Sequence, residues 1–349
     1  MSSRRRHERG SQSESRAAGP AGPAGATAAS EPWAIAWSQA DGLRTLTSLD
    51  AIKKAYGEEG SRLWIDLISP DAPLLAPLTK LLGLHPLVTE DILERNQRAK
   101  IEQTGDALHL VMFSLQYAGE VVPHELDIVL GPRYLLTSHD ANIDLRGAPF
   151  MRREPGSYLS EGADFMLWSV TDWLVDEYFP VFDKLGDEID ELEVDVLRKP
   201  GTYVVERLFT LRRDLLEIRH AVNPQREIFN QLTNRDLAQV KPERIVYFRD
   251  VYDHLIRLTD ELDSYRELVS TTLDIYLSQI NNNLSEIMKR LTGVTVILAT
   301  IGAIGGIFGM SEAGAAFNFT ESWGFWVVTA AAIVIAIVFY VLLKRRGYI

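Results

Sequence analysis

The first 140 residues combine short apolar runs with longer segments of helical spacing. Five runs are rich in β-branched and aromatic residues: 33–37, 63–68, 107–115, 125–130 and 134–139. This pattern predicts β-strands. Between them, residues 46–57 and 73–84 place apolar positions at helical spacing and predict helices. Because the strands cluster toward the end of the region, we expect hairpins in part of the sheet, within an α+β domain over residues 33–160.

From residue 161 to 290 the strand pattern stops and helical periodicity dominates. Breaks are expected at Lys199-Pro200-Gly201 and near Asn223-Pro224. The last helical stretch begins near Pro242 and meets no strong breaker until the glycines after residue 300. Such a helix would be about 100 Å long. A single chain of this size cannot cover it, so the pattern predicts a stalk that packs against other chains.

Two long uncharged segments lie near the C-terminus. Residues 291–310 and 323–343 carry no charged side chain, and each is long enough to cross a hydrocarbon core of about 30 Å. Basic residues precede the first segment and open the tail 344–349, whereas the loop 311–322 has two acids and no base. The length and apolarity of the two segments predict two transmembrane helices in a plasma membrane, or in the inner membrane of a bacterium, with membrane lipid as a partner. The distribution of basic residues predicts that both termini are cytoplasmic.

Two spans in one chain cannot enclose a polar path, so a channel would need several copies around an axis. Heptad steps from Asp274 place polar, small and apolar side chains on one narrow face of the long helix. Its members include Met288, Leu291, Thr295, Gly302 and Gly309. In a ring of helices this face would line a pore, with Met288 and Leu291 as a dehydrating constriction. Register setting in a coiled coil and plain helix packing are the alternatives.

Composition and the lack of catalytic motifs refine this picture. The mean hydropathy of −0.05 averages two membrane spans with a polar body. The net charge of −12 argues against a nucleic-acid-binding protein, and the absence of cysteine excludes disulfides and thiolate metal sites. Residues 1–32 are polar and rich in Gly, Ala and Pro, which predicts a disordered tail. No phosphate-binding loop, nucleophile elbow or metalloprotease motif appears in the sequence, so we do not expect an enzyme.

Three blocks of sequence resemble the CorA family of magnesium and cobalt transporters. HPLVTEDILERNQRAKIE (85–102) is similar to its cytoplasmic domain, and YFRDVYDHLIRLTDELDSYREL (247–268) with LDIYLSQINNNLSEIMKRLT (273–292) to its stalk. IGGIFGM (304–310) is similar to the segment that leads into the family's Gly-Met-Asn signature. The resemblance implies a homopentameric funnel with no obligatory protein partner, and a pore for hydrated Mg²⁺ that passes Co²⁺ or Ni²⁺ incidentally.

The resemblance also implies cytoplasmic carboxylates that bind Mg²⁺ between neighbouring chains and close the pore. By position, Asp274 and Asp91 match that sensor, and Asp250 with Glu90 matches a second, weaker site. Mg²⁺ prefers oxygen ligands and keeps several of its waters, so a few carboxylates at a chain boundary suffice.

The signature departs from the family at one position. It reads Gly309-Met310-Ser311, with serine in place of asparagine, and Glu312 follows. Serine offers one short hydroxyl where asparagine offers an amide, so five serines would hold a hydrated ion less tightly. Glu312 would then supply a carboxylate ring. Two alternatives stay open: a Zn²⁺ transporter of the ZntB branch, and a non-conducting cation sensor or scaffold with a degenerate filter.

Overall fold

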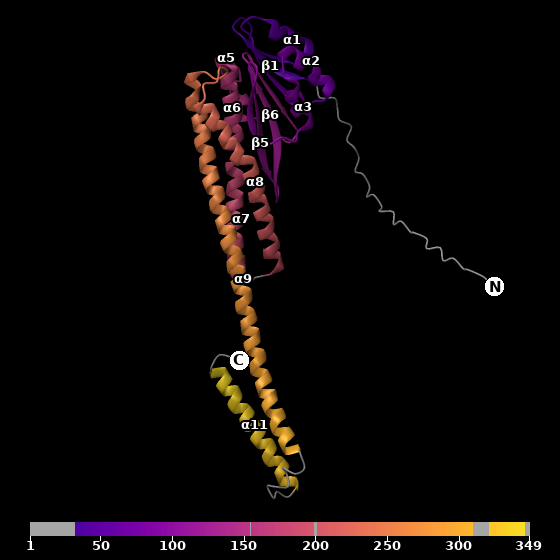
Figure 1. Ribbon diagram of the computed structural model, residues 1–349, viewed down its shortest axis with the longest axis vertical. Helices are drawn as coiled ribbons and strands as arrows, with labels where there is room; N and C mark the ends of the chain where they lie inside the picture. Colours follow the sequence, from indigo (N-terminus) through magenta and orange to yellow (C-terminus); the bar gives the residue numbers. More distant parts are fainter. Residues whose placement is uncertain (1–31, 154, 199–200, 310–320, 346–349) are drawn as a thin grey trace, which may run out of the picture.

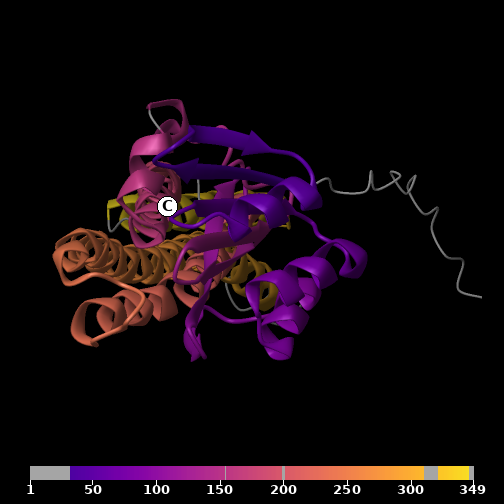
Figure 2. The ribbon, with the colours of Figure 1, turned by 90° about the horizontal axis from the view of Figure 1, so that it is seen from above.

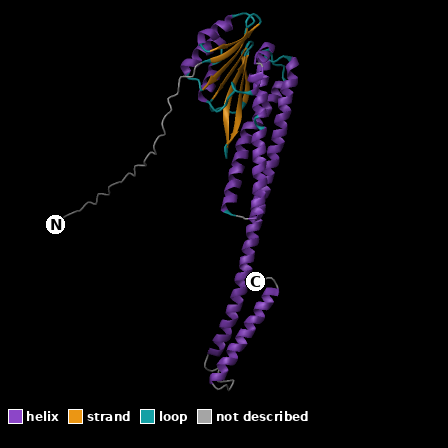
Figure 3. Ribbon diagram, turned by 180° about the vertical axis from the view of Figure 1, so that it is seen from behind, coloured by secondary structure: helices purple, strands orange, loops and turns teal. Residues whose placement is uncertain are grey.

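The computed structural model describes residues 32–153, 155–198, 201–309 and 321–345. A sheet with its helices forms one end of the molecule, and everything beyond it is helical (Figures 1 and 3). The expected disordered tail 1–32 lies outside the described residues except for its last position, and so does most of the expected loop 311–322.

Seven strands form a single mixed sheet. In chain order they are β1 Trp33–Ser38, β2 Gly42–Leu46, β3 Arg62–Ile68, β4 Lys100–Thr104, β5 Ala107–Tyr117, β6 Val121–Leu130 and β7 Tyr134–His139. The order across the sheet is β2-β1-β3-β7-β6-β5-β4. Strands β3 and β7 pair in parallel, and the other neighbours are antiparallel, which confirms the expected hairpins. The sequence pattern missed β2 and β4, because they are short and contain few buried residues.

Helices cover both faces of the sheet (Figure 2). One face carries α1 Leu49–Gly57, α2 Ala72–Leu82 and α3 Pro86–Glu94, whose apolar side chains share one core with β1, β3 and β7. The other face belongs to a larger core with the later helices. Those helices are α4 Pro149–Arg153, α5 Pro155–Glu161, α6 Ala163–Asp176, α7 Phe179–Arg198, α8 Thr202–Asn234, the 3₁₀ turn η1 Pro242–Arg244, α9 Ile245–Gly309 and α11 Glu321–Arg345.

The expected break near Pro224 is wrong, because α8 continues through this proline. A proline inside a helix removes one hydrogen bond and costs about 3 kcal/mol. Here, Ala221, Val222, Ile228 and Phe229 are buried on either side of it. Burial of these side chains against the neighbouring helices offsets that cost. The expected long helix is confirmed, since α9 spans 65 residues without interruption.

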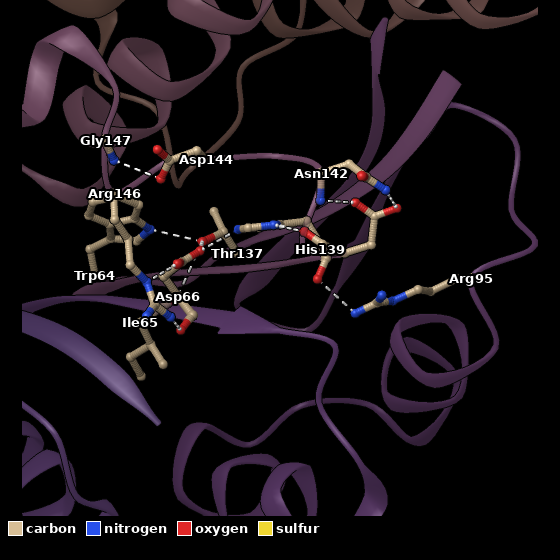
Figure 4. Close-up of polar contacts among 11 residues, drawn as sticks. Trp64, Ile65, Asp66, Arg95, Thr137, His139, Asn142, Asp144, Arg146 and Gly147 are labelled. Atoms are coloured by element: carbon tan, nitrogen blue, oxygen red, sulfur yellow. Dashed lines mark hydrogen bonds and ion pairs between the residues drawn. The ribbon is translucent and has the colours of Figure 1, made fainter. Parts of the chain in front are cut away.

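A buried polar network joins the parallel pair of strands to the segment that follows the sheet (Figure 4). Asp66 of β3 is fully buried and accepts hydrogen bonds from Thr137 at 2.7 Å and from Arg146 at 2.6 Å. It also lies 3.0 Å from His139 Nε2. Burial raises the pKa of Asp66, but the hydrogen bond and charge of His139, with Thr137 and Arg146, outweigh it and lower the pKa below its usual value. The network therefore holds a charge inside the sheet domain.

Candidate cation sites and the exposed face of the long helix

Three carboxylates and a histidine meet where α6 packs against α9. Asp172 and Asp176 are one turn apart on α6, and Asp250 and His254 are one turn apart on α9. Side chains four residues apart project from the same side of a helix, so each pair faces the other. His254 Nδ1 lies 3.4 Å from Asp176 Oδ1. The sequence prediction had identified only Asp250 of these four residues.

The carboxylates of this cluster repel one another. Burial, together with the charges of Asp176 and Asp250, raises the pKa of Asp172 to about 6. Burial also raises the pKa of Asp176, with His254 opposing and Asp250 adding to the effect. Both shifts mean that the ionised cluster is electrostatically unfavourable as it stands. Oxygen ligands with excess negative charge suit a hard divalent cation such as Mg²⁺, which would neutralise them.

The expected sensor residues on α3 have different surroundings. The helix begins at Pro86, where the side chain of His85 accepts a hydrogen bond from the backbone N–H of Leu87 at 3.2 Å. Asp91 is largely buried and forms an ion pair with Lys100 of β4 at 2.8 Å. Glu90 is exposed.

The expected pairings are not made within one chain. Among the described residues, no hydrogen bond or ion pair joins Glu90 or Asp91 to Asp250 or Asp274. Both of these aspartates are exposed on α9. Contacts between neighbouring chains therefore stay a prediction.

The lower half of α9 exposes most of its apolar side chains. Over Pro242–Gly306, an 18-residue window has a mean hydropathy of 1.6, and 6% of that window is buried. Within the part of the chain that the structure describes, this is the helix that is long and apolar enough to cross a membrane. The second expected span, 323–343, falls within α11, a helix of 25 residues.

The expected pore face lies on the side of α9 that faces away from α11. Gly293, Ile297, Thr300 and Ile304 are the less exposed positions of the lower helix, on the side where α11 packs. At about 3.6 residues per turn, the expected pore residues lie roughly opposite. Those residues are exposed: Met288 by 53%, Leu291 by 57%, and Thr295 and Gly302 likewise.

Gly302 leaves open space on that side. A Cβ atom added there would meet nothing within 4 Å. The Thr295 hydroxyl donates to the backbone carbonyl of Leu291 at 2.8 Å, as is usual inside a helix. Gly309 ends α9, and Met310, Ser311 and Glu312 lie outside the described residues, so the expected outer mouth is not described.

Asp172, Asp176 and His254 are the site residues that sequence reasoning missed. A signal was present, because the acids of TDWLVD and the pair in DVYDH are each spaced for one side of a helix. Periodicity alone does not say which two helices face each other, and that requires the packing of α6 on α9.

Most of the chain is similar to known proteins of one family. The family described as "CorA-like Mg2+ transporter protein" matches residues 59–345. The chain is 34% identical over 276 residues to the cobalt/magnesium transport protein CorA of Thermotoga maritima, covering 76% of this chain and 77% of the relative. It is 22% identical over 296 residues to the zinc transport protein ZntB of Yersinia enterocolitica, covering 82% and 87%.

A solved structure extends the likeness to the whole fold. The complete CorA magnesium transporter of Methanocaldococcus jannaschii superposes with a TM-score of 0.77 at 26% identity. The match covers 90% of this chain and 98% of that one. The mixed α/β domain and the long helix that leads toward the membrane are thus confirmed.

The burial of Asp172 beside two other carboxylates leads to a prediction. Its folded-state pKa is raised from 3.8 to about 6, so folding carries a cost that is absent below pH 4 and fully present above pH 6. Asp172→Asn removes this cost and should stabilise the metal-free protein at pH 8 by about 1 kcal/mol after allowance for solvent screening. The same change should shrink the rise in thermal midpoint that Mg²⁺ produces.

Thermal melts of the detergent-solubilised protein, with and without Mg²⁺ and at pH 4 and pH 8, measure both effects. Asp187→Asn, at an exposed position of α7, is the matched control. An undiminished response of Asp172→Asn to Mg²⁺ would remove this residue from the cation site.

Proposed function

The chain belongs to the CorA-like Mg²⁺ transporter family, whose members carry divalent cations across membranes, and we propose that it forms a homopentameric channel for Mg²⁺ gated by cytoplasmic cation binding. The observation that carries the proposal is the continuous helix α9. It runs from the acidic cluster around Asp250 to an apolar lower half that the described chain leaves exposed.

The lower half of α9 fits the wall of a shared pore. α11 packs on one side of it, and the opposite side carries Met288, Leu291, Thr295 and Gly302. A ring of five such helices would bury that exposed side and enclose a path, which one chain cannot do. The bare surface at Gly302 would allow close approach of neighbouring helices. In this arrangement, α11 faces the lipid as the second span, with both termini in the cytoplasm.

Gating follows from electrostatics. Without Mg²⁺, carboxylates such as Asp250 and Asp274 repel those of neighbouring subunits, which loosens the closed ring. Bound Mg²⁺ would neutralise them and hold the subunits together. The raised pKa of Asp172 supports this scheme, because burial and the charges of Asp176 and Asp250 oppose its ionisation, and a bound cation would relieve that opposition.

Flux into proteoliposomes tests the proposal directly. We expect Mg²⁺ entry, with slower entry of Co²⁺ and Ni²⁺, when the purified protein is challenged with Mg²⁺, Co²⁺, Ni²⁺ and Zn²⁺ with and without a pH gradient. Preference for Zn²⁺ would favour the ZntB-like alternative, to which 22% identity lends some support. If no divalent cation moves while Mg²⁺ still changes protease resistance, the chain is a sensor and the channel proposal fails.

Asp274→Ala should leave the channel more open at high internal Mg²⁺. Asp274 is exposed on α9, and no ion pair within the described chain engages its carboxylate. Its removal therefore takes away a ligand without leaving an unpaired partner. Flux in vesicles preloaded with Mg²⁺, alongside the concentration of Mg²⁺ needed for protease protection, measures the effect. Asp260→Ala, exposed earlier on the same helix, is the control, and unchanged protection in Asp274→Ala excludes Asp274 from the sensor.

Ser311→Asn should sharpen the preference for Mg²⁺ over Co²⁺ and Ni²⁺. The amide adds an acceptor and two donors that can grip the water shell of the ion. Competition flux in the same proteoliposomes measures selectivity, with Ser322→Asn at the start of α11 as the matched control. An unaltered ion preference would assign the outer mouth to Glu312.

A further inference from the structure

A second cluster of ligand atoms lies inside the sheet domain, between α3 and the strands that follow it. Asp91 of α3, Glu102 of β4 and His109 of β5 each offer one ligand atom, and these atoms lie within 4.8 Å of one another. The sheet register explains the meeting, because Glu102 and His109 are directly opposite in the antiparallel β4–β5 pair. All three residues belong to one chain, so the cluster does not require a neighbouring subunit.

His109 is set up as a metal ligand. The ring is fully buried, and its Nε2 lies 3.0 Å from Oδ1 of Asp127, itself 1% exposed. With Nε2 donating to this carboxylate, the neutral ring keeps its lone pair on Nδ1. That atom has no hydrogen-bond partner and lies 4.0 Å from Asp91 Oδ2, too far for a hydrogen bond. A histidine that donates one ring N–H to a carboxylate and leaves the other nitrogen free is the usual arrangement at metal centres.

Lys100 now balances the charge of the cluster. Its Nζ lies 2.8 Å from Asp91 and 3.3 Å from Glu102. Burial lowers the pKa of Lys100, but the hydrogen bonds to the two carboxylates outweigh it and raise the pKa. The ammonium group thus acts as a tethered cation between the two acidic ligands. It does not engage the imidazole, because Lys100 donates to the two carboxylates and His109 Nδ1 has no hydrogen-bond partner.

We propose that Asp91, Glu102 and His109 form an intrachain binding site for a transition-metal dication of the Zn²⁺, Co²⁺ or Ni²⁺ type, and that the metal displaces Lys100. An imidazole nitrogen with two carboxylates suits these ions, whereas Mg²⁺ favours oxygen ligands alone. Lys100 makes occupancy conditional, because a metal must be bound tightly enough to replace an existing ion pair. The site shares Asp91 with the expected Mg²⁺ sensor, but it is separate from the cluster around Asp250 and does not depend on transport.

Calorimetric titration of the metal-stripped full-length protein in detergent with Co²⁺ and with Zn²⁺ tests the site. All proteins compared, the parent included, carry His254→Asn, which removes the one imidazole of the α6–α9 cluster as a competing nitrogen ligand. Lys100→Met removes the competing cation and should tighten Co²⁺ and Zn²⁺ binding about tenfold or more. Glu102→Gln removes a ligand and should weaken it by a similar factor. Mg²⁺ affinity should change little in Glu102→Gln.

Glu102 is half exposed, so its substitution should not prevent folding. Lys100→Met and Glu102→Gln therefore test the metal site even if a change at buried His109 unfolds the protein. Where His109→Gln folds, it should abolish the preference for Co²⁺ over Mg²⁺, because glutamine offers no imidazole nitrogen. His220→Gln, an exposed histidine on α8, is the control. Equal Co²⁺ affinity in the parent, Lys100→Met and Glu102→Gln proteins would overturn the proposal.

Discussion

The lower half of α9 presents apolar surface that the described remainder of the chain leaves uncovered, and this constraint governs the architecture. Apolar area in water is unfavourable at about 25 cal/mol per Å², and Leu291 and Leu298 alone are 57% and 64% exposed. α11 covers one side of the helix only. Lipid and further copies of the chain are the two environments that can cover the rest, and a channel uses both.

The same helix links the two ends of the molecule mechanically. Asp250 lies in the upper part of α9, where the helix packs on α6, α7 and α8, and Gly302 lies in the membrane part. These residues are about 80 Å apart along an unbroken helix. A change in tilt at the acidic cluster therefore moves the lower end without any hinge. At the upper end, the hydrogen bonds of buried Asp66 tie β3 to β7 and to the segment that follows the sheet.

The two acidic clusters above the apolar half of α9 differ in how their charge is balanced. Around Asp172 the charges of Asp176 and Asp250 add to one another, and His254 Nδ1 lies 3.4 Å from Asp176 Oδ1. Around Asp91 a lysine already occupies the space between the carboxylates. In the proposed scheme, a divalent cation stabilises the first cluster directly, whereas it enters the second only in exchange for Lys100. This difference suits sensing of an abundant ion at one cluster and a more strongly coordinating ion at the other.

Much of the architecture was encoded locally. The absence of breakers after Pro242 determined a helix of 65 residues, and the apolar segments determined where a membrane would lie, because helix continuity and hydropathy are properties of neighbouring residues. Pro224 was misjudged since its local cost is outweighed by burial of side chains around it. Tertiary structure alone brings Asp172 close to Asp250. It also brings His109 close to Asp91. Such contacts depend on which faces of distant elements pack together, and no local pattern in one chain specifies that pairing.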